Sequence, residues 1–143
     1  MAAYVVDASV VIQYAIAQAQ TAAARNLVAR MYERDLLHIP EFCILECANV
    51  LWKQVRFHGL SQLNAEQIIQ ELMYLPFQIE SVIQLLPNAL EIGLAYQLAV
   101  YDSLYIALAQ SLELPLITVD DRQAVAATAR RIMVKAVDDF SVH

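Results

Sequence analysis

The chain has 143 residues, a length typical of one domain, and its net charge of −6 argues against a protein that coats nucleic acid through bulk positive charge. Hydrophobic residues make up 59% of the sequence, so membrane insertion has to be considered. The most apolar stretch, residues 89–109, is interrupted by Glu91, Gln97 and Asp102 and lacks the roughly 18 unbroken apolar residues of a membrane span. We therefore expect no membrane association, but a densely buried core and an apolar oligomer interface.

The first half of the chain alternates short apolar runs with segments of helical period. AYVVDA predicts a strand that ends at Asp7, and LLHIP predicts a second strand that Pro40 stops. Ser61 is the expected N-cap of a helix that continues to Leu75. Other helices are expected over residues 9–17, 22–34 and 41–57.

The second half repeats this alternation. FQIESV, PLITVD and RIMVKAV predict the third, fourth and final strands, and the fourth ends at Asp120. Helices are expected over residues 87–98, 102–112 and 122–130. Strands separated by helices predict βαβ units, and hence a single α/β domain over residues 1–143 with a largely parallel sheet of four to five strands. The two glycines, Gly59 and Gly93, exclude a G-x-G-x-x-G motif or a P-loop.

The cysteines and the first residues favour a reducing cytoplasm. Cys43 and Cys47 stand four apart in a helical pattern with no histidine at ligand spacing, so we interpret them as buried small residues. Met1 is followed by a strand pattern without the positive residues of a signal peptide.

Four carboxylates stand where a ligand site is expected. Asp7 and Asp120 end two predicted parallel strands, and ligands of open parallel sheets bind outside the carboxyl ends of the strands. Asp102 begins a predicted helix, whose N-terminus favours an anion, and Glu46 lies in an otherwise apolar helical segment. We expect these acids to face one crevice.

Each carboxylate also has a purely structural interpretation. Asp102 and Asp120 are natural helix caps, with Asp121 a solvated neighbour, and Glu46 has Arg25 or Lys53 as a possible ion-pair partner. Clustered carboxylates repel and raise one another's pKa, and a divalent cation relieves that repulsion. Oxygen ligands alone suit Mg²⁺ or Mn²⁺. Such an ion can clamp phosphoryl oxygens and activate water for hydrolysis.

The segments VVDASVVIQY, LECANVLWK, YDSLYIALA and PLITVDD, in this order and spacing, resemble the PIN-domain ribonucleases, and especially the VapC-type toxins of toxin–antitoxin pairs. The resemblance covers essentially the whole chain and implies a PIN-like α/β/α sandwich. It implies that Asp7, Glu46, Asp102 and Asp120 form a catalytic metal site for Mg²⁺ or Mn²⁺. Supporting positions are implied for Ser9, Asn49, Ser103 and, less securely, Asp121, while an exposed polar role is an equal alternative for Asn49.

The resemblance further implies metal-dependent endonucleolytic hydrolysis of RNA, a homodimer, and an antitoxin whose tail occupies the acidic groove. The expected groove walls are residues 22–34, 41–57 and the run to Leu75. Lys53, two helical turns after Glu46, is the best candidate for a phosphate contact, and Arg25 is a second.

Trp52 is a possible base-stacking residue, although packing is the favoured interpretation. His38, His58 and His143 match no family motif, and we expect them to be structural or exposed.

Two other classes of protein are alternatives for this sequence. A non-catalytic PIN fold that binds RNA or protein is the main alternative, and the presence of all four acids counts against it. A receiver-type phosphoacceptor domain would need an acidic pair after the first strand and a lysine after the last one. Here one acid ends the first strand and Lys135 lies inside the final strand.

Overall fold

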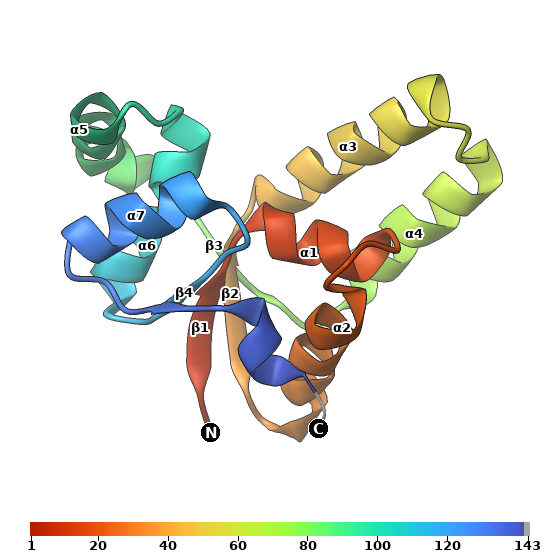
Figure 1. Cartoon of the computed structure of the whole chain (residues 1–143), viewed down its shortest axis with the longest axis horizontal. Coiled ribbons are helices and arrows are strands. Elements are labelled where there is room, and N and C mark those ends of the chain that lie inside the picture. The colour runs from red at the N-terminus through yellow and green to blue at the C-terminus, as the bar shows by residue number, and fades with distance from the viewer. Residues whose placement is uncertain (142–143) are drawn as a thin grey trace.

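The computed structural model describes residues 1–141, so His143 lies outside the described part of the chain. Five parallel strands form one sheet in the order β3-β2-β1-β4-β5. Helices cover both faces, as Figure 1 shows, and the α/β prediction is confirmed. The strands are β1 (Ala3–Val6), β2 (Leu36–Pro40), β3 (Gln78–Glu80), β4 (Leu116–Ile117) and β5 (Val134–Lys135).

The α-helices follow the expected order with shifted ends. They are α1 (Ala8–Ala15), α2 (Thr21–Ala29), α3 (Cys43–Phe57), α4 (Gln62–Tyr74), α5 (Leu86–Tyr96), α6 (Val100–Leu112) and α7 (Asp121–Ala129). Short 3₁₀ helices are η1 (Arg30–Glu33), η2 (Ile83–Leu85) and η3 (Val137–Phe140). Ser61 caps α4 by accepting from the Asn64 N–H, as expected.

Several predicted elements, including the third and the final strand, are shorter than expected, and the reason can be identified for two others. The helix over residues 22–34 ends at Ala29 and tightens into η1, because Arg34 turns the chain with a φ of 83°. The fourth strand stops at Ile117 because side chains take over its backbone donors: Ser9 Oγ accepts from the Val119 N–H, and Thr118 Oγ1 accepts from the Asp120 N–H.

The core surrounds β1, β4 and α6. Residues 103–109 of α6 are all buried, because α6 packs between the sheet and helices α5 and α7, and this accounts for much of the most apolar stretch of the sequence. Within residues 1–141 no single helix is long and apolar enough to cross a membrane; only the pair Ile83–Tyr96 and Val100–Leu112, bent by 117°, meets the length and composition test together. Cys43 and Cys47 are buried free thiols.

At the amino end of the sheet, the buried Asp35 forms an ion pair with the half-exposed Arg30 and connects the residues that precede β1 and β2. Asp35 precedes β2 and accepts a hydrogen bond from the Ala2 N–H at 2.9 Å, while Arg30 Nε donates to its other oxygen at 2.7 Å. The Ala2 N–H first, and then Arg30, hold the pKa of Asp35 below its ordinary value. This contact sets where β1 begins beside β2.

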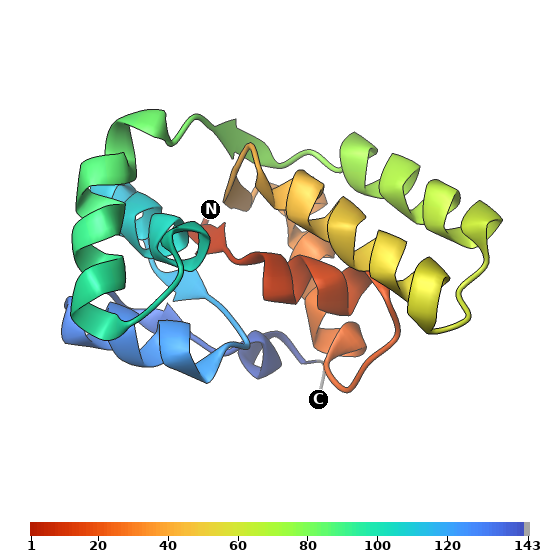
Figure 2. The same ribbon diagram turned by 90° about the horizontal axis from the view of Figure 1, so that it is seen from above.

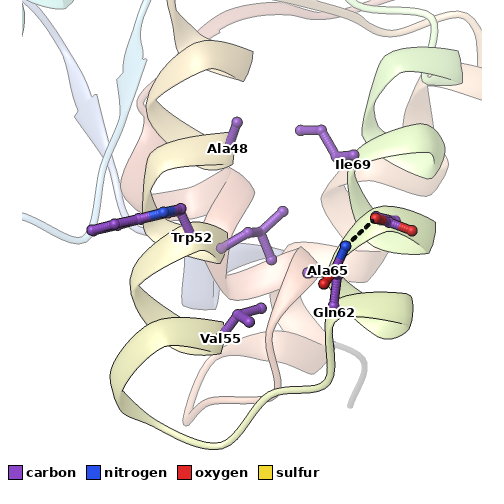
Figure 3. A pocket seen from close by; sticks show the side chains of 8 residues that line it. Ala48, Trp52, Val55, Gln62, Ala65 and Ile69 are labelled. Carbon is purple, nitrogen blue, oxygen red and sulfur yellow. Dashed lines mark hydrogen bonds between the residues drawn. The ribbon is translucent and has the colours of Figure 1, made fainter.

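Helices α3 and α4 form a hairpin that extends beyond the sheet, and they lie side by side in both Figure 1 and Figure 2. Between them is a largely apolar groove of about 410 Å³, shown in Figure 3, to which Leu51, Val55 and Ile69 contribute. Residues from 41–57 and from the run to Leu75, two of the three expected walls of the antitoxin groove, line this groove, and α2 contributes no lining residue to it.

Candidate acidic active site

Asp7 directly follows β1 and is only 4% exposed. It caps α1 by accepting from the Ser9 N–H through Oδ2, and the same oxygen accepts from Ser9 Oγ at 2.6 Å and lies 3.0 Å from Thr118 Oγ1. In the described part of the chain, Oδ1 has one hydrogen-bond donor, Gln123 Nε2 at 3.3 Å. One oxygen is therefore surrounded by neutral donors, and the other keeps lone pairs for a ligand.

Thr118 and Gln123 form the frame that holds Asp7. Gln123 is completely buried, and its Nε2 also donates to the backbone oxygen of Asp102 at 3.1 Å. Thr118 Oγ1 lies 3.0 Å from Asp7 Oδ2 and 2.9 Å from Gln123 Oε1. Because a hydroxyl has one hydrogen, Thr118 donates to one of these acceptors at a time. The frame links β1, α6 and the start of α7.

Glu46 lies in the first turn of α3 and is fixed by a side chain from α6. The hydroxyl of the buried Tyr105 donates to Glu46 Oε1 at 2.7 Å. Burial raises the pKa of Glu46, the bond from Tyr105 opposes this, and the charges of Asp7 and Asp102 raise the pKa further. No ion pair of Glu46 is found within residues 1–141, so the alternative that pairs it with Arg25 or Lys53 is wrong.

Asp102 and Asp120 complete the acidic group, but only one of them caps a helix. The N-cap of α6 is Ala99, so the cap interpretation of Asp102 is wrong. Burial raises the pKa of Asp102, and Asp7 and Asp120 raise it further, against a lowering by Arg122. Asp120 does cap α7, because Oδ1 accepts from the Arg122 and Gln123 N–H groups.

The four carboxylates therefore occupy one region at the carboxyl end of the sheet and act on one another electrostatically. Burial is the main cause that raises the pKa of Asp7, and neutral hydrogen bonds only partly oppose it. This all-oxygen donor set suits a hard divalent cation. As the side chains stand, no three acidic, histidine or cysteine groups in residues 1–141 are close enough to hold an ion together.

A cleft of about 420 Å³, lined by both polar and apolar residues, lies beside Glu46 between α1 and α3. Ser9, Asn49 and Lys53 line it together with Glu46, so one predicted cation and two predicted supporting residues face the same space as an acid of the site. Lys53 is exposed and in no ion pair of the described chain.

Comparison with known proteins identifies the fold family, because the model of the PIN domain matches residues 4–129. The chain belongs to the PIN-domain family. It is also similar to Ribonuclease VapC3 of Pyrobaculum aerophilum, with 30% identity over 122 residues that cover 84% of this chain and 91% of that protein.

Solved structures agree with the fold of this PIN domain. PAE2754 from Pyrobaculum aerophilum aligns with a TM-score of 0.75 at 22% identity, over 96% of this chain and 92% of that one. VapBC2 from Rickettsia felis, solved with a DNA fragment from the promoter, aligns with a TM-score of 0.70 at 8% identity, over 94% and 98% of the two chains.

Three predicted residues of this PIN domain are not drawn into the acidic group. Ser103 is completely buried and donates to the Ala99 carbonyl oxygen at 2.9 Å, so its hydroxyl serves α6 rather than the carboxylates. Asp121 is exposed beside Asp120. Arg25 is exposed on α2 and does not line the cleft that Lys53 and Glu46 share.

Sequence reasoning missed Tyr105 and Gln123, and it recognised Thr118 only as part of a motif. Tyr105 stands three residues after Asp102 and hence on its helix face, but it lies inside an apolar stretch typical of core. Gln123 shares a helix face with Ala126 and Ala127, which are buried, and a glutamine on that face is the signal that was available.

Proposed function

We propose that this chain is a metal-dependent endoribonuclease that hydrolyses RNA phosphodiester bonds, and that it is the toxin of a type II toxin–antitoxin pair. The observation that carries the proposal is the convergence of Asp7, Glu46, Asp102 and Asp120 at the carboxyl end of the sheet in a member of the PIN-domain family. The similarity to a protein named Ribonuclease VapC3 supports the RNA substrate.

The donor set fits Mg²⁺ or Mn²⁺, and Asp7, Glu46, Asp102 and Asp120 are the proposed ligands. When bound, the ion would neutralise the carboxylates and the scissile phosphate and lower the pKa of a water. The side chains would have to come closer together than they stand.

The chain's own residues orient this chemistry. Ser9, Thr118 and Gln123 hold Asp7 so that Oδ1 is its less occupied oxygen, and Tyr105 holds Oε1 of Glu46. Asn49 and Lys53 face the adjoining cleft, where a cation can contact a phosphate of the bound strand. Asp121 and Arg25, both exposed, have at most a supporting part in holding RNA.

An antitoxin and a second copy of the chain are the proposed protein partners. Structural neighbours of this fold include VapBC2 and FitAB complexes with DNA, which supports an antitoxin as partner. The apolar groove between α3 and α4 is the proposed antitoxin site, and a homodimer would cover part of the remaining exposed apolar surface. We place this activity in the cytoplasm, in keeping with the free thiols, and in one domain over residues 1–143.

The test is cleavage of a labelled RNA pool by the purified chain with Mg²⁺, with Mn²⁺ and with EDTA. Cleavage that needs metal and is lost in Asp7→Asn supports the proposal. Asp139→Asn is the matched control, because Asp139 is an exposed aspartate of η3 outside the acidic group. RNA binding without cleavage by folded, antitoxin-free protein would favour the non-catalytic binding module instead.

A further inference from the structure

One face of α3 leads from the acidic site along the projecting hairpin. Asn49, Trp52, Lys53, Arg56 and Phe57 follow one another at spacings of three, one, three and one residues, which places them along one stripe of the helix. All five are exposed. From Glu46 to Phe57 the helix rises by about 16 Å. The stripe begins beside Glu46, with which Asn49 and Lys53 share a cleft, and it follows α3, which Figure 1 shows extending away from the sheet.

The two aromatic residues of this stripe are arranged on the surface. Trp52 is 56% exposed and Phe57 is 64% exposed, and their rings meet edge to face with centroids 5.9 Å apart. The guanidinium of Arg56 lies over the Phe57 ring at 5.5 Å. Trp52 contributes to the lining of the groove between α3 and α4, yet in Figure 3 its indole extends from α3 on the side away from α4, where the ring is accessible.

The cations of the stripe are available to a ligand. The chain has only nine lysines and arginines and a net charge of −6, yet Lys53 and Arg56 stand one helical turn apart on this face. Neither is in an ion pair within residues 1–141. Cations in line with exposed aromatic rings are the combination that binds single-stranded nucleic acid, because bases stack on the rings while phosphates contact the charges.

We propose that the face of α3 formed by Trp52, Lys53, Arg56 and Phe57 binds the single-stranded RNA that flanks the cleaved bond. This inference rests on the proposed nuclease function and names where its substrate lies. Trp52 stacks on a base, and Lys53 and Arg56 contact consecutive stretches of the backbone as the strand leaves the acidic site. The face reads no base edges, so it contributes affinity and direction rather than sequence specificity.

Trp52 supplies its own probe because it is the single tryptophan of the chain. The Asp7→Asn protein is titrated with a fluorescent single-stranded RNA, and both tryptophan emission and RNA anisotropy are recorded, while the wild-type chain is assayed for metal-dependent cleavage. We expect quenching of the tryptophan with the same midpoint as the anisotropy. Trp52→Ala in this background should weaken binding about tenfold or more, and Trp52→Phe should restore much of the loss.

The salt dependence tests the cations separately. Lys53→Gln and Arg56→Gln should each reduce the slope of log K against log salt by about 0.7. The matched controls are Tyr74→Ala, an 83% exposed aromatic of α4, and Arg131→Gln, an exposed arginine between α7 and β5. Neither control should change affinity or slope.

The outcomes separate this inference from the proposed function. The inference is overturned if the wild-type chain shows metal-dependent cleavage but RNA neither quenches the tryptophan nor binds more weakly to the stripe variants. That result would leave the proposed nuclease function supported, and the face would then be free for a protein partner. Absence of both cleavage and RNA binding overturns the two together.

Discussion

Asp7 and Asp35 are both buried aspartates beside the central strand, at its opposite ends, and their surroundings differ in one respect. Asp35 accepts hydrogen bonds from the Ala2 N–H and from Nε of the positively charged Arg30, and its pKa is lowered. Among residues 1–141, the hydrogen-bond partners of Asp7 are the neutral groups of Ser9, Thr118 and Gln123, and its pKa is raised by burial.

Asp35 therefore stabilises the fold, whereas the charge of Asp7 remains available to bind a cation. A positive side chain beside Asp7 would satisfy its charge, and it would also compete with a cation for the same oxygens. Neutral donors orient the carboxylate without neutralising it. The amino end of the sheet is thus held by a compensated charge. The carboxyl end gathers negative charges that the described residues compensate only in part, through the effect of Arg122 on Asp102.

The largest effect is expected from removing the charge of Asp7. Asp7→Asn should lower metal-dependent RNA cleavage by at least about 100-fold, since even residues that only support metal ligands cost up to that much. The same variant should raise the free energy of unfolding of the metal-free protein by about 1 kcal/mol at neutral pH, because a desolvated charge is lost. Cleavage assays and thermal denaturation in EDTA measure the two effects. A destabilised variant would mean that the neutral donors compensate the charge fully.

The opposite result is expected at the other end of the strand. Asp35→Ala should lower the free energy of unfolding by about 2 kcal/mol, below the usual cost of breaking a buried pair because the Arg30 side chain is 44% exposed. Its cleavage rate per folded molecule should equal that of the wild type. Urea denaturation gives the first quantity. A loss of cleavage in fully folded Asp35→Ala would show that the two ends of the sheet are coupled.

A smaller effect is expected from the hydroxyl that holds Glu46. Tyr105→Phe removes the hydrogen bond to Glu46 Oε1 and keeps the ring against Phe42. Mn²⁺ affinity and the cleavage rate should each fall about tenfold. The free energy of unfolding should fall by only about 1 kcal/mol, because one hydrogen bond is lost. Tyr101→Phe is the matched control, because that ring also packs on Phe42 from the same helix. Titration calorimetry with Mn²⁺ measures the affinity. Equal affinity in both variants would remove Tyr105 from the site.

The smallest effect is a difference in pH dependence. Asp7, Glu46 and Asp102 have raised pKa values, so the folded metal-free chain binds protons more tightly than the unfolded chain. Its stability should therefore rise as the pH falls through these raised pKa values, until the carboxyls of the unfolded chain are protonated as well at about pH 4. Asp35 has a lowered pKa, so its stabilisation is complete above about pH 4 and is lost as the pH falls further.

Denaturation in EDTA at a series of pH values should give the free energy of unfolding of the wild type and both variants. In Asp7→Asn this free energy should rise less than in the wild type as the pH falls from neutral, and in Asp35→Ala it should fall less in acid. Parallel curves for all three proteins would contradict the contrast between the two aspartates.

The sequence predicted the order of elements and the parallel sheet, because strand and helix periods alternate clearly and Pro40 and Pro76 separate elements. It placed Asp7 and Asp120 at the same edge of the sheet through the geometry of parallel strands. The frame around Asp7 could not be predicted, because Thr118 and Gln123 meet it only through contacts between β1, β4 and α7. Ser103 shows the converse. Its position next to Asp102 in the sequence suggested a supporting role, but successive residues of a helix point in different directions, and Ser103 points into the core.

The hydroxyl of Thr118 has a consequence for how this edge of the sheet responds to a change of charge. Its single hydrogen has two acceptors at nearly equal distance, Asp7 Oδ2 and Gln123 Oε1. When the demand of Asp7 for a donor decreases, rotation about one C–O bond transfers the hydrogen to Gln123, and no heavy atom has to move. The Thr118 hydroxyl thus has two alternative orientations, one toward Asp7 and one toward Gln123. The same packing of side chains can therefore accommodate two charge states of Asp7.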